Sequence, residues 1–279
     1  LPEVFPEDIE AGVKYVNNDA CYPSIIVIGQ LLYALQSGKY DLDTTTVVIT
    51  QTGGGCRATN YIALLRKALR EAGFGKVPVL SANLTGTEAH PGFKLTGALL
   101  KKAIRGIVYG DLLMRVLHRV RPYEKIPGSA NLLYEKWIKE CRRQLLVGDS
   151  KTFKSNLRRI VEEFDRLEIN DVKKPRVGVV GEILVKYHPA ANNNIVSLLE
   201  QEGAEAVVPD LLDFFTYSAY DSVFRYQQLS GSGKAMLVAR LFIKYMENAR
   251  KEMCRALEAS QRFTAPESVY HLAEKASRI

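Results

Sequence analysis

A glycine-rich loop that ends in a cysteine is the first part of the sequence that could do chemistry. It contains four successive residues: Gly53, Gly54, Gly55 and Cys56. Consecutive glycines leave backbone N–H groups free to surround an anion, and a following helix N-terminus adds partial positive charge. The loop is neither a P-loop, since no Lys-Ser/Thr pair follows, nor a Gly-x-Gly-x-x-Gly turn. With Arg57 beside it, a thiolate at Cys56 is stabilised, which suits a metal ligand or a nucleophile.

A second cysteine, Cys21, also precedes a helical pattern. It stands before Pro23, a residue tolerated in a first helical turn, and before the apolar stretch 24–35. Two cysteines at helix N-termini could face one another across the strand ends and hold an anionic iron–sulfur cluster. A free cysteine is just as often a small buried hydrophobic residue. The spacing leaves both interpretations open.

The other two of the four cysteines, Cys141 and Cys254, lie on apolar faces of helical patterns and are predicted to be packing residues. No Cys-x-x-Cys pair is present, so we expect reduced thiols rather than a disulfide framework.

A loop after the strand-like run 176–180 holds a second group of polar residues. Glu182 follows the strand, and His188 stands before Asn192 in the same loop. A carboxylate and an imidazole placed in this way are candidates for proton transfer or for orienting the ligands of a site. The alternative is structural, because Asn192 suits a helix N-cap and a single loop histidine is often simply exposed.

The elements that must position these residues alternate between strands and helices at both ends of the chain. We predict strands at 47–50, 77–80, 176–180 and 206–208. Between them, from Gly92 to about Leu167, the pattern is helical, with breaks at 121–123 and 148–149. The fold class predicted is α/β, with two Rossmann- or flavodoxin-like parallel-sheet lobes at 1–91 and 171–279 around a helical, basic segment at 92–170.

Charge is concentrated in that middle segment. The chain of 279 residues carries a net charge of +7, while residues 101–159 alone hold 15 basic and 5 acidic side chains. Such a segment indicates a docking surface for an anion such as a nucleotide, coenzyme A or an acidic protein face, or else a solvated helical insertion. Basic residues are not interleaved with aromatic residues on a known module, so nucleic acid is not a predicted partner.

Two further absences bear on the class of protein. No apolar run approaches the ~20 residues of a membrane span, and the N-terminus does not resemble a signal peptide. We therefore expect a cytoplasmic protein without a membrane partner. The missing initiator Met suggests a piece of a longer polypeptide.

The stretch Ile49–Tyr61, which reads ITQTGGGCRATNY, resembles the cysteine motif of the 2-hydroxyacyl-CoA dehydratase superfamily. The closest resemblance is to the dehydratase-like C-terminal region of the large acyl-CoA dehydratase activase-related proteins. It extends over nearly the whole chain, through the segments Asn17–Pro23, Val108–Met114, Val179–Asn194 and Val207–Phe215.

The resemblance implies a redox function. Dehydratase subunits of this kind hold a [4Fe–4S] cluster through cysteines, and an ATP-driven activase delivers a low-potential electron so that a ketyl radical of the acyl-CoA loses water. Carried onto this chain, Cys21 and Cys56 become cluster ligands, with the glycine loop and Arg57 stabilising the charge and Glu182 or His188 nearby. The expected partners are acyl-CoA or an anionic redox partner such as the activase region.

The chain departs from that family in two ways: it has no clear third cysteine in a loop and no activase ATP motif. It is therefore not expected to hydrolyse ATP, or to be active alone. Three hypotheses follow: an iron–sulfur redox domain, a non-catalytic regulatory or interaction module that kept the fold without a cluster, and a phosphate-binding α/β domain that uses the glycine loop.

Overall fold

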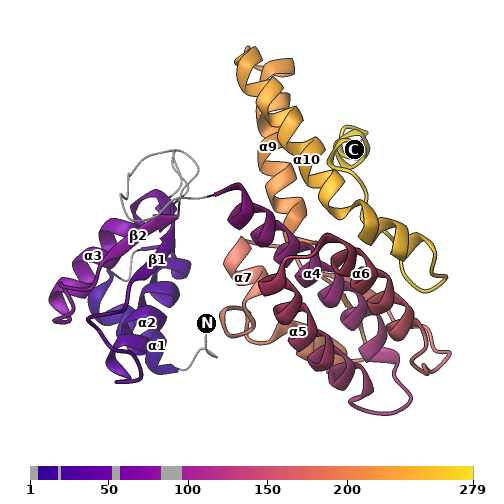
Figure 1. Cartoon of the computed structure of the whole chain (residues 1–279), viewed down its shortest axis with the longest axis horizontal. Coiled ribbons are helices and arrows are strands. Elements are labelled where there is room, and N and C mark those ends of the chain that lie inside the picture. The colour runs from indigo at the N-terminus through magenta and orange to yellow at the C-terminus, as the bar shows by residue number, and fades with distance from the viewer. Residues whose placement is uncertain (1–5, 18–19, 52–56, 83–95, 279) are drawn as a thin grey trace. The chain divides into compact units, whose positions relative to one another are not determined.

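The computed structural model describes residues 6–17, 20–51, 57–82 and 96–278, which pack as two units (Figure 1). The first unit comprises residues 1–95 together with 184–194, and the second comprises 96–183 together with 195–279. Most of the predicted basic segment and most of the predicted C-terminal lobe therefore share one unit.

The first unit is built from three longer helices and a small parallel sheet. Its elements are α1 (Pro6–Tyr15), α2 (Tyr22–Gln36), β1 (Val47–Thr50), a 3-10 turn (Arg57–Asn60), α3 (Tyr61–Glu71), β2 (Val79–Ala82), α7 (Ile183–Tyr187) and a second 3-10 turn (Pro189–Asn192). The first residue of α7, Ile183, belongs to the second unit. Strands β1 and β2 pair in parallel, with Val47 opposite Val79 and Thr50 opposite Ala82. Strand β1 thus has the bounds that the sequence predicts, and β2 lies two residues later than the predicted strand at 77–80.

Helices α1 and α2 approach so closely that their backbones touch. A Cβ atom added at Gly29 would lie 1.8 Å from the carbonyl oxygen of Asp8, and one added at Gly12 would lie 2.1 Å from that of Ile25. Only glycine fits these two positions. The apolar faces of α2, α3 and β1 complete the core, with Ile28, Leu32, Leu65 and others fully buried.

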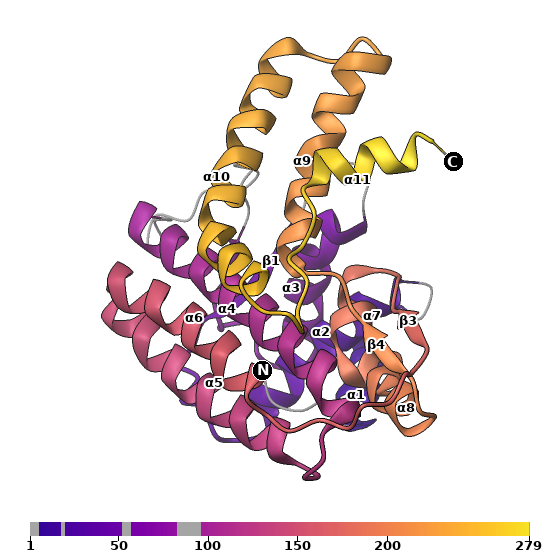
Figure 2. The ribbon, with the colours of Figure 1, turned by 90° about the vertical axis from the view of Figure 1, so that its right-hand side faces the viewer.

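The second unit is mainly helical. Its elements are α4 (Gly97–Val120), a 3-10 turn (Arg121–Tyr123), α5 (Ser129–Val147), α6 (Ser150–Asp165), β3 (Arg176–Gly178), α8 (Ile195–Gln201), β4 (Glu205–Val207), α9 (Leu211–Gln228), α10 (Gly233–Glu258) and α11 (Val269–Ala276). Strands β3 and β4 pair in parallel. Helices α4, α5 and α6 pack together, while α9 and α10 form a long hairpin (Figure 2).

Helix α4 is the central element of this unit. One side of it buries Val108, Leu112 and Val116 against α5, α6 and α10. The single tryptophan of the chain, Trp137, is 1% exposed in the same core. Apolar residues at helical spacing along α4 account for this packing.

Many charges of the basic segment are satisfied inside the second unit. Arginines from this segment pair with carboxylates that lie later in the chain: Arg115 with Asp210, Arg119 with Glu205, Arg121 with Glu200 and Arg158 with Glu252. These pairs link α4, the 3-10 turn after it and α6 to β4, α8, the N-terminus of α9 and α10. Part of the charge excess that the sequence shows therefore serves internal packing.

The fold is mixed α/β and mostly helical, with two small parallel sheets among the described residues. The helical breaks predicted at 121–123 and 148–149 are confirmed, since α4 ends at Val120 and Gly148 ends α5 with a positive φ of 80°. Asn192 is not the N-cap that the sequence predicts. Its side-chain amide donates to the carbonyl oxygen of Val185 at 2.8 Å, and α8 starts only at Ile195.

Candidate functional site

Cys21 lies at the N-terminus of α2, as the position of Pro23 indicates. It is the residue directly before the helix, its backbone is extended (φ −63°, ψ 141°), and its thiol makes no capping hydrogen bond to the helix. The residue is half-buried and free of disulfide bonding. Its carbonyl oxygen accepts from the Ser24 hydroxyl at 2.8 Å, which fixes the first turn.

The partner of the Cys21 thiol is a tyrosine that begins α3. The Sγ atom of Cys21 lies 2.7 Å from the hydroxyl oxygen of Tyr61. Tyr61 is placed by the burial of Ile62 and Leu65, which anchor α3 in the core of the first unit. Either atom can donate in this contact, and a tyrosine hydroxyl is able to donate to a thiolate sulfur.

Cys56 and the three glycines Gly53, Gly54 and Gly55 lie outside the described residues. Arg57 begins the 3-10 turn that leads into α3, and only its backbone is described. The residues on either side of this segment are tied together: the Gln51 amide donates to the carbonyl oxygen of Thr59 at 2.9 Å and accepts from the Ser81 hydroxyl at 2.8 Å. The partly buried side chain of Gln51 thus joins the end of β1, the turn before α3 and the end of β2 through two hydrogen bonds.

His188 is half-buried in the first unit, where its ring meets a buried glutamine. The Nε2 atoms of His188 and Gln30 lie 3.5 Å apart, and Gln30 is 1% exposed. Burial lowers the pKa of His188, so the neutral imidazole is favoured. Among the described residues, His188 Nδ1 and Gln30 Oε1 are buried without a hydrogen-bond partner.

The structure assigns the remaining predicted residues to different places. Glu182 is exposed and belongs to the second unit, whereas Cys21 and His188 belong to the first. Cys141 is 4% exposed in the core of the second unit, and Cys254 is half-buried on α10. Burial raises the pKa of Cys141 to about 12 and that of Cys254 to about 11, so both remain neutral thiols near pH 7.

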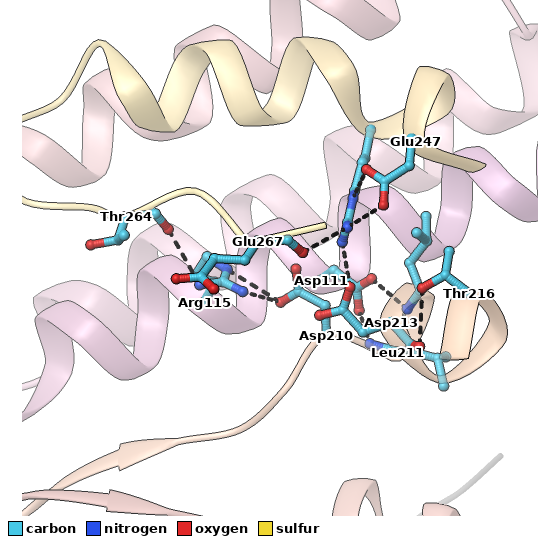
Figure 3. Close-up of polar contacts among 11 residues, drawn as sticks. Asp111, Arg115, Asp210, Leu211, Asp213, Thr216, Glu247, Thr264 and Glu267 are labelled. Carbon is cyan, nitrogen blue, oxygen red and sulfur yellow. Dashed lines mark hydrogen bonds and ion pairs between the residues drawn. The ribbon is translucent and has the colours of Figure 1, made fainter. Parts of the chain in front are cut away.

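A polar network in the second unit was not predicted from the sequence (Figure 3). The carboxylate of Asp111, on α4, accepts hydrogen bonds from the backbone N–H groups of Leu211 at 2.7 Å and Leu212 at 3.0 Å. It therefore caps α9, although Asp210 occupies the N-cap position of that helix. Burial, reinforced by the nearby carboxylate of Asp210, raises the pKa of Asp111.

Two arginines hold the carboxylates of this network. Arg115 donates through Nη2 to Asp210 at 2.8 Å, and Arg250 donates to both Asp213 and Glu247 (Figure 3). Asp210 is fully buried, and its Oδ2 atom has no hydrogen-bond partner in the described part of the chain. The only sequence signal for this network was the expected family resemblance, whose segments Val108–Met114 and Val207–Phe215 contain Asp111 and Asp210.

No group of three or more His, Cys, Asp or Glu side chains within the described ranges is arranged to hold a metal ion. Among the same residues, no helix combines the length and apolar character needed to cross a membrane. Comparison with protein-family models, with curated proteins and with solved structures gave no match.

Proposed function

We propose that this chain is an iron–sulfur redox domain of a 2-hydroxyacyl-CoA dehydratase- or activase-like protein, in which Cys21 and Cys56 ligate a [4Fe–4S] cluster. The observation that supports it is the 2.7 Å contact between Cys21 Sγ and the Tyr61 hydroxyl. Tyr61 begins the helix that follows the Gly-Gly-Gly-Cys loop in the chain. The finer fold proposed is a pair of Rossmann- or flavodoxin-like lobes, of which the two parallel strand pairs are parts.

The surroundings of Cys21 suit a thiolate ligand. The residue lies at a helix N-terminus, where free backbone N–H groups favour negative charge, and a hydroxyl donor faces its sulfur. Hydrogen bonds to ligand sulfurs are one of the means by which proteins tune a cluster's potential. Tyr61 is therefore proposed to orient the ligand and to raise the potential.

The donor set fits such a cluster in part. Cys21 supplies one thiolate, Cys56 is proposed to supply a second, and Cys141 and Cys254 are unsuitable because burial keeps them neutral. Further ligands must come from another part of a longer polypeptide, from a partner or from an external group. When bound, a cluster of this kind supplies a one-electron carrier of low potential.

Proton transfer is proposed for His188 and Glu182. A neutral His188, whose pKa is lowered by burial, can accept a proton at its unpartnered Nδ1 atom. Glu182 is exposed, and its role is proposed from its position after β3. The proposed partners are an acyl-CoA or an anionic redox partner such as an activase region.

Anaerobic reconstitution with iron and sulfide tests the proposal, with iron content and EPR spectra as readouts. We expect the parent chain to take up iron and the double variant Cys21→Ala, Cys56→Ala to lose it. Cys254→Ala is the matched control, since it removes one half-buried thiol from the second unit and should leave uptake unchanged.

Tyr61→Phe adds a readout specific to the contact. Loss of the hydroxyl should shift the reduction potential of the cluster to a lower value while the iron content stays the same. If the parent takes up no more iron than the double variant, the cluster proposal is wrong. The chain is then better described as a regulatory or interaction module that kept the fold.

A further inference from the structure

A pocket in the second unit collects positive charge away from the cysteines. Its volume is about 250 Å³, and it lies along β4, between α4 and the segment that follows α10. Four arginines from three parts of the chain line it: Arg115, Arg119, Arg176 and Arg262. Their convergence on one small space needs an explanation, because like charges repel one another.

A single buried carboxylate positions two of these arginines. Glu205 is 2% exposed and accepts from Arg119 Nη1 at 2.6 Å and from Arg176 Nε at 3.0 Å. The hydroxyl of Tyr123 donates to it as well, at 2.8 Å. Glu205 thus accepts three hydrogen bonds, and it fixes the orientation of the two guanidinium groups.

The other two arginines are held mainly by their own partners. Arg115 binds Asp210 and the carbonyl oxygen of Thr264 (Figure 3). Arg262 donates through Nη1 to the carbonyl oxygens of Phe164 and Leu167, and Asp165 lies 3.7 Å from its Nε. Both side chains are largely buried, at 24% and 18% exposed, so their charges are desolvated.

Donors remain after these contacts are made. Arg119 Nη2, Arg262 Nη2 and both terminal nitrogens of Arg176 have no hydrogen-bond acceptor among the described residues. Against four arginines the adjoining carboxylates are Glu205, Asp210 and Asp165, so positive charge is in excess. His118, also in the lining, adds no charge near pH 7, because burial lowers its pKa to about 4.

We propose that this pocket binds the phosphate group of a small phosphorylated ligand. Arginines that carry spare guanidinium N–H groups line it from α4, from β3 and from the segment after α10, which suits a tetrahedral anion with three acceptor oxygens. A carboxylate has two oxygens in one plane and is satisfied by a single bidentate arginine. The volume lies just below the range of ~300–1,000 Å³ typical of ligand pockets, so it accommodates a phosphate with a small body.

The proposal is independent of the cluster, since it concerns the second unit and uses none of its thiols. The test is isothermal titration calorimetry of the full chain at pH 7.5 and constant ionic strength. Inorganic phosphate, glycerol 3-phosphate and acetate are the three probes. We expect both phosphates to bind saturably and acetate to bind at least tenfold more weakly.

Two variants with the same loss of charge show whether the pocket is responsible. Arg176→Met removes spare donors from the pocket and should weaken phosphate binding about tenfold. Arg143→Met removes an exposed arginine on α5, which is 71% exposed and outside the pocket lining, and should change the affinity less than twofold. If Arg176→Met fails to fold, Arg176→Lys keeps the charge but loses the planar fork, and the same weakening is expected.

The outcomes separate the sources of the anion. Tighter binding of glycerol 3-phosphate indicates an organic phosphomonoester, and equal binding indicates recognition of the phosphate group alone; either supports the proposal. It is overturned if neither phosphate binds saturably, if acetate binds equally well, or if Arg143→Met and Arg176→Met weaken binding to the same extent. Cys21→Ala should leave the titration unchanged even if the cluster proposal fails.

Discussion

Replacing Arg250 by methionine should strongly destabilise the second unit. Arg250 is 1% exposed and donates to three groups: Glu247, through two hydrogen bonds of 2.9 and 2.7 Å, Asp213, and the carbonyl oxygen of Glu267 at 3.2 Å (Figure 3). Methionine keeps most of the volume of the side-chain stem but removes every donor. The two carboxylates then remain without their counter-ion.

The size of the effect follows from how well those carboxylates can reach water. Removing one partner of a fully buried ion pair costs about 3–5 kcal/mol. Asp213 is 22% exposed and Glu247 is 30% exposed, so each regains some hydration. We therefore expect a loss of about 2–4 kcal/mol in the free energy of unfolding, which corresponds to roughly 5–15 °C in Tm for a unit of this size.

Fluorescence provides the assay, because the single tryptophan, Trp137, is buried in the core of the second unit. Urea unfolding is followed by this signal for the parent, for Arg250→Met and for Arg225→Met. Arg225 pairs with Asp221 on α9 with both side chains at least 50% exposed, so its loss should cost no more than about 0.5 kcal/mol.

A rescue variant tests the physical reason. If the cost arises from unpaired carboxylates, adding Asp213→Asn and Glu247→Gln to Arg250→Met should recover part of the lost stability. A loss below about 1 kcal/mol for Arg250→Met, or no recovery in the triple variant, would refute the reasoning.

Three further predictions follow from other parts of the molecule. Gly29→Ala should lower the Tm of the first unit, measured by circular dichroism, by more than about 5 °C, because the added Cβ would lie 1.8 Å from a carbonyl oxygen of α1. Gly110→Ala is the control: its added Cβ meets nothing within 4 Å, so the change should be neutral or stabilising. His118 has a pKa lowered to about 4, so the folded state favours its neutral form and stability is lost as the pH falls from about 6.5 toward 4. In urea unfolding, the loss of stability between pH 8 and pH 5 should therefore shrink by about 2 kcal/mol in His118→Gln, and an unchanged loss would contradict the assignment. Iodoacetamide should modify Cys21 well before Cys141, whose pKa is raised to about 12, and peptide mass spectrometry would expose the reverse order.

Local features of the fold were predictable from the sequence, whereas features that depend on contacts between distant residues were not. Val47–Thr50 is a β-branched run, and the structure makes it a strand with those same bounds. Arg121-Pro122 and Gly148-Asp149 end helices because proline lacks an N–H donor and glycine adopts a positive φ. The size of the sheets was not predictable, since pairing depends on residues far apart in the chain.

For the candidate site too, the position of a residue in its helix was predictable, but its contacts with distant residues were not. The position of Cys21 before α2 follows from Pro23 and the apolar helix behind it. Its contact with Tyr61 does not, because 40 residues separate the two in sequence. The network of Asp111 and Asp210 was missed for the same reason: their segments stood out one at a time, and a single sequence does not show that they meet.

The cap that Asp111 provides for α9 also bears on how the second unit folds. The amides that it binds lie 100 and 101 residues further along the chain, so closing this contact requires a large loss of chain entropy. These two N-terminal hydrogen bonds of α9 therefore form only when α4 and the start of α9 are in contact. During synthesis, about ninety residues must be added after α4 before the donors for the Asp111 carboxylate are present in the chain. Asp111 thus couples the two helices: the N-terminus of α9 is capped only if α4 is correctly placed.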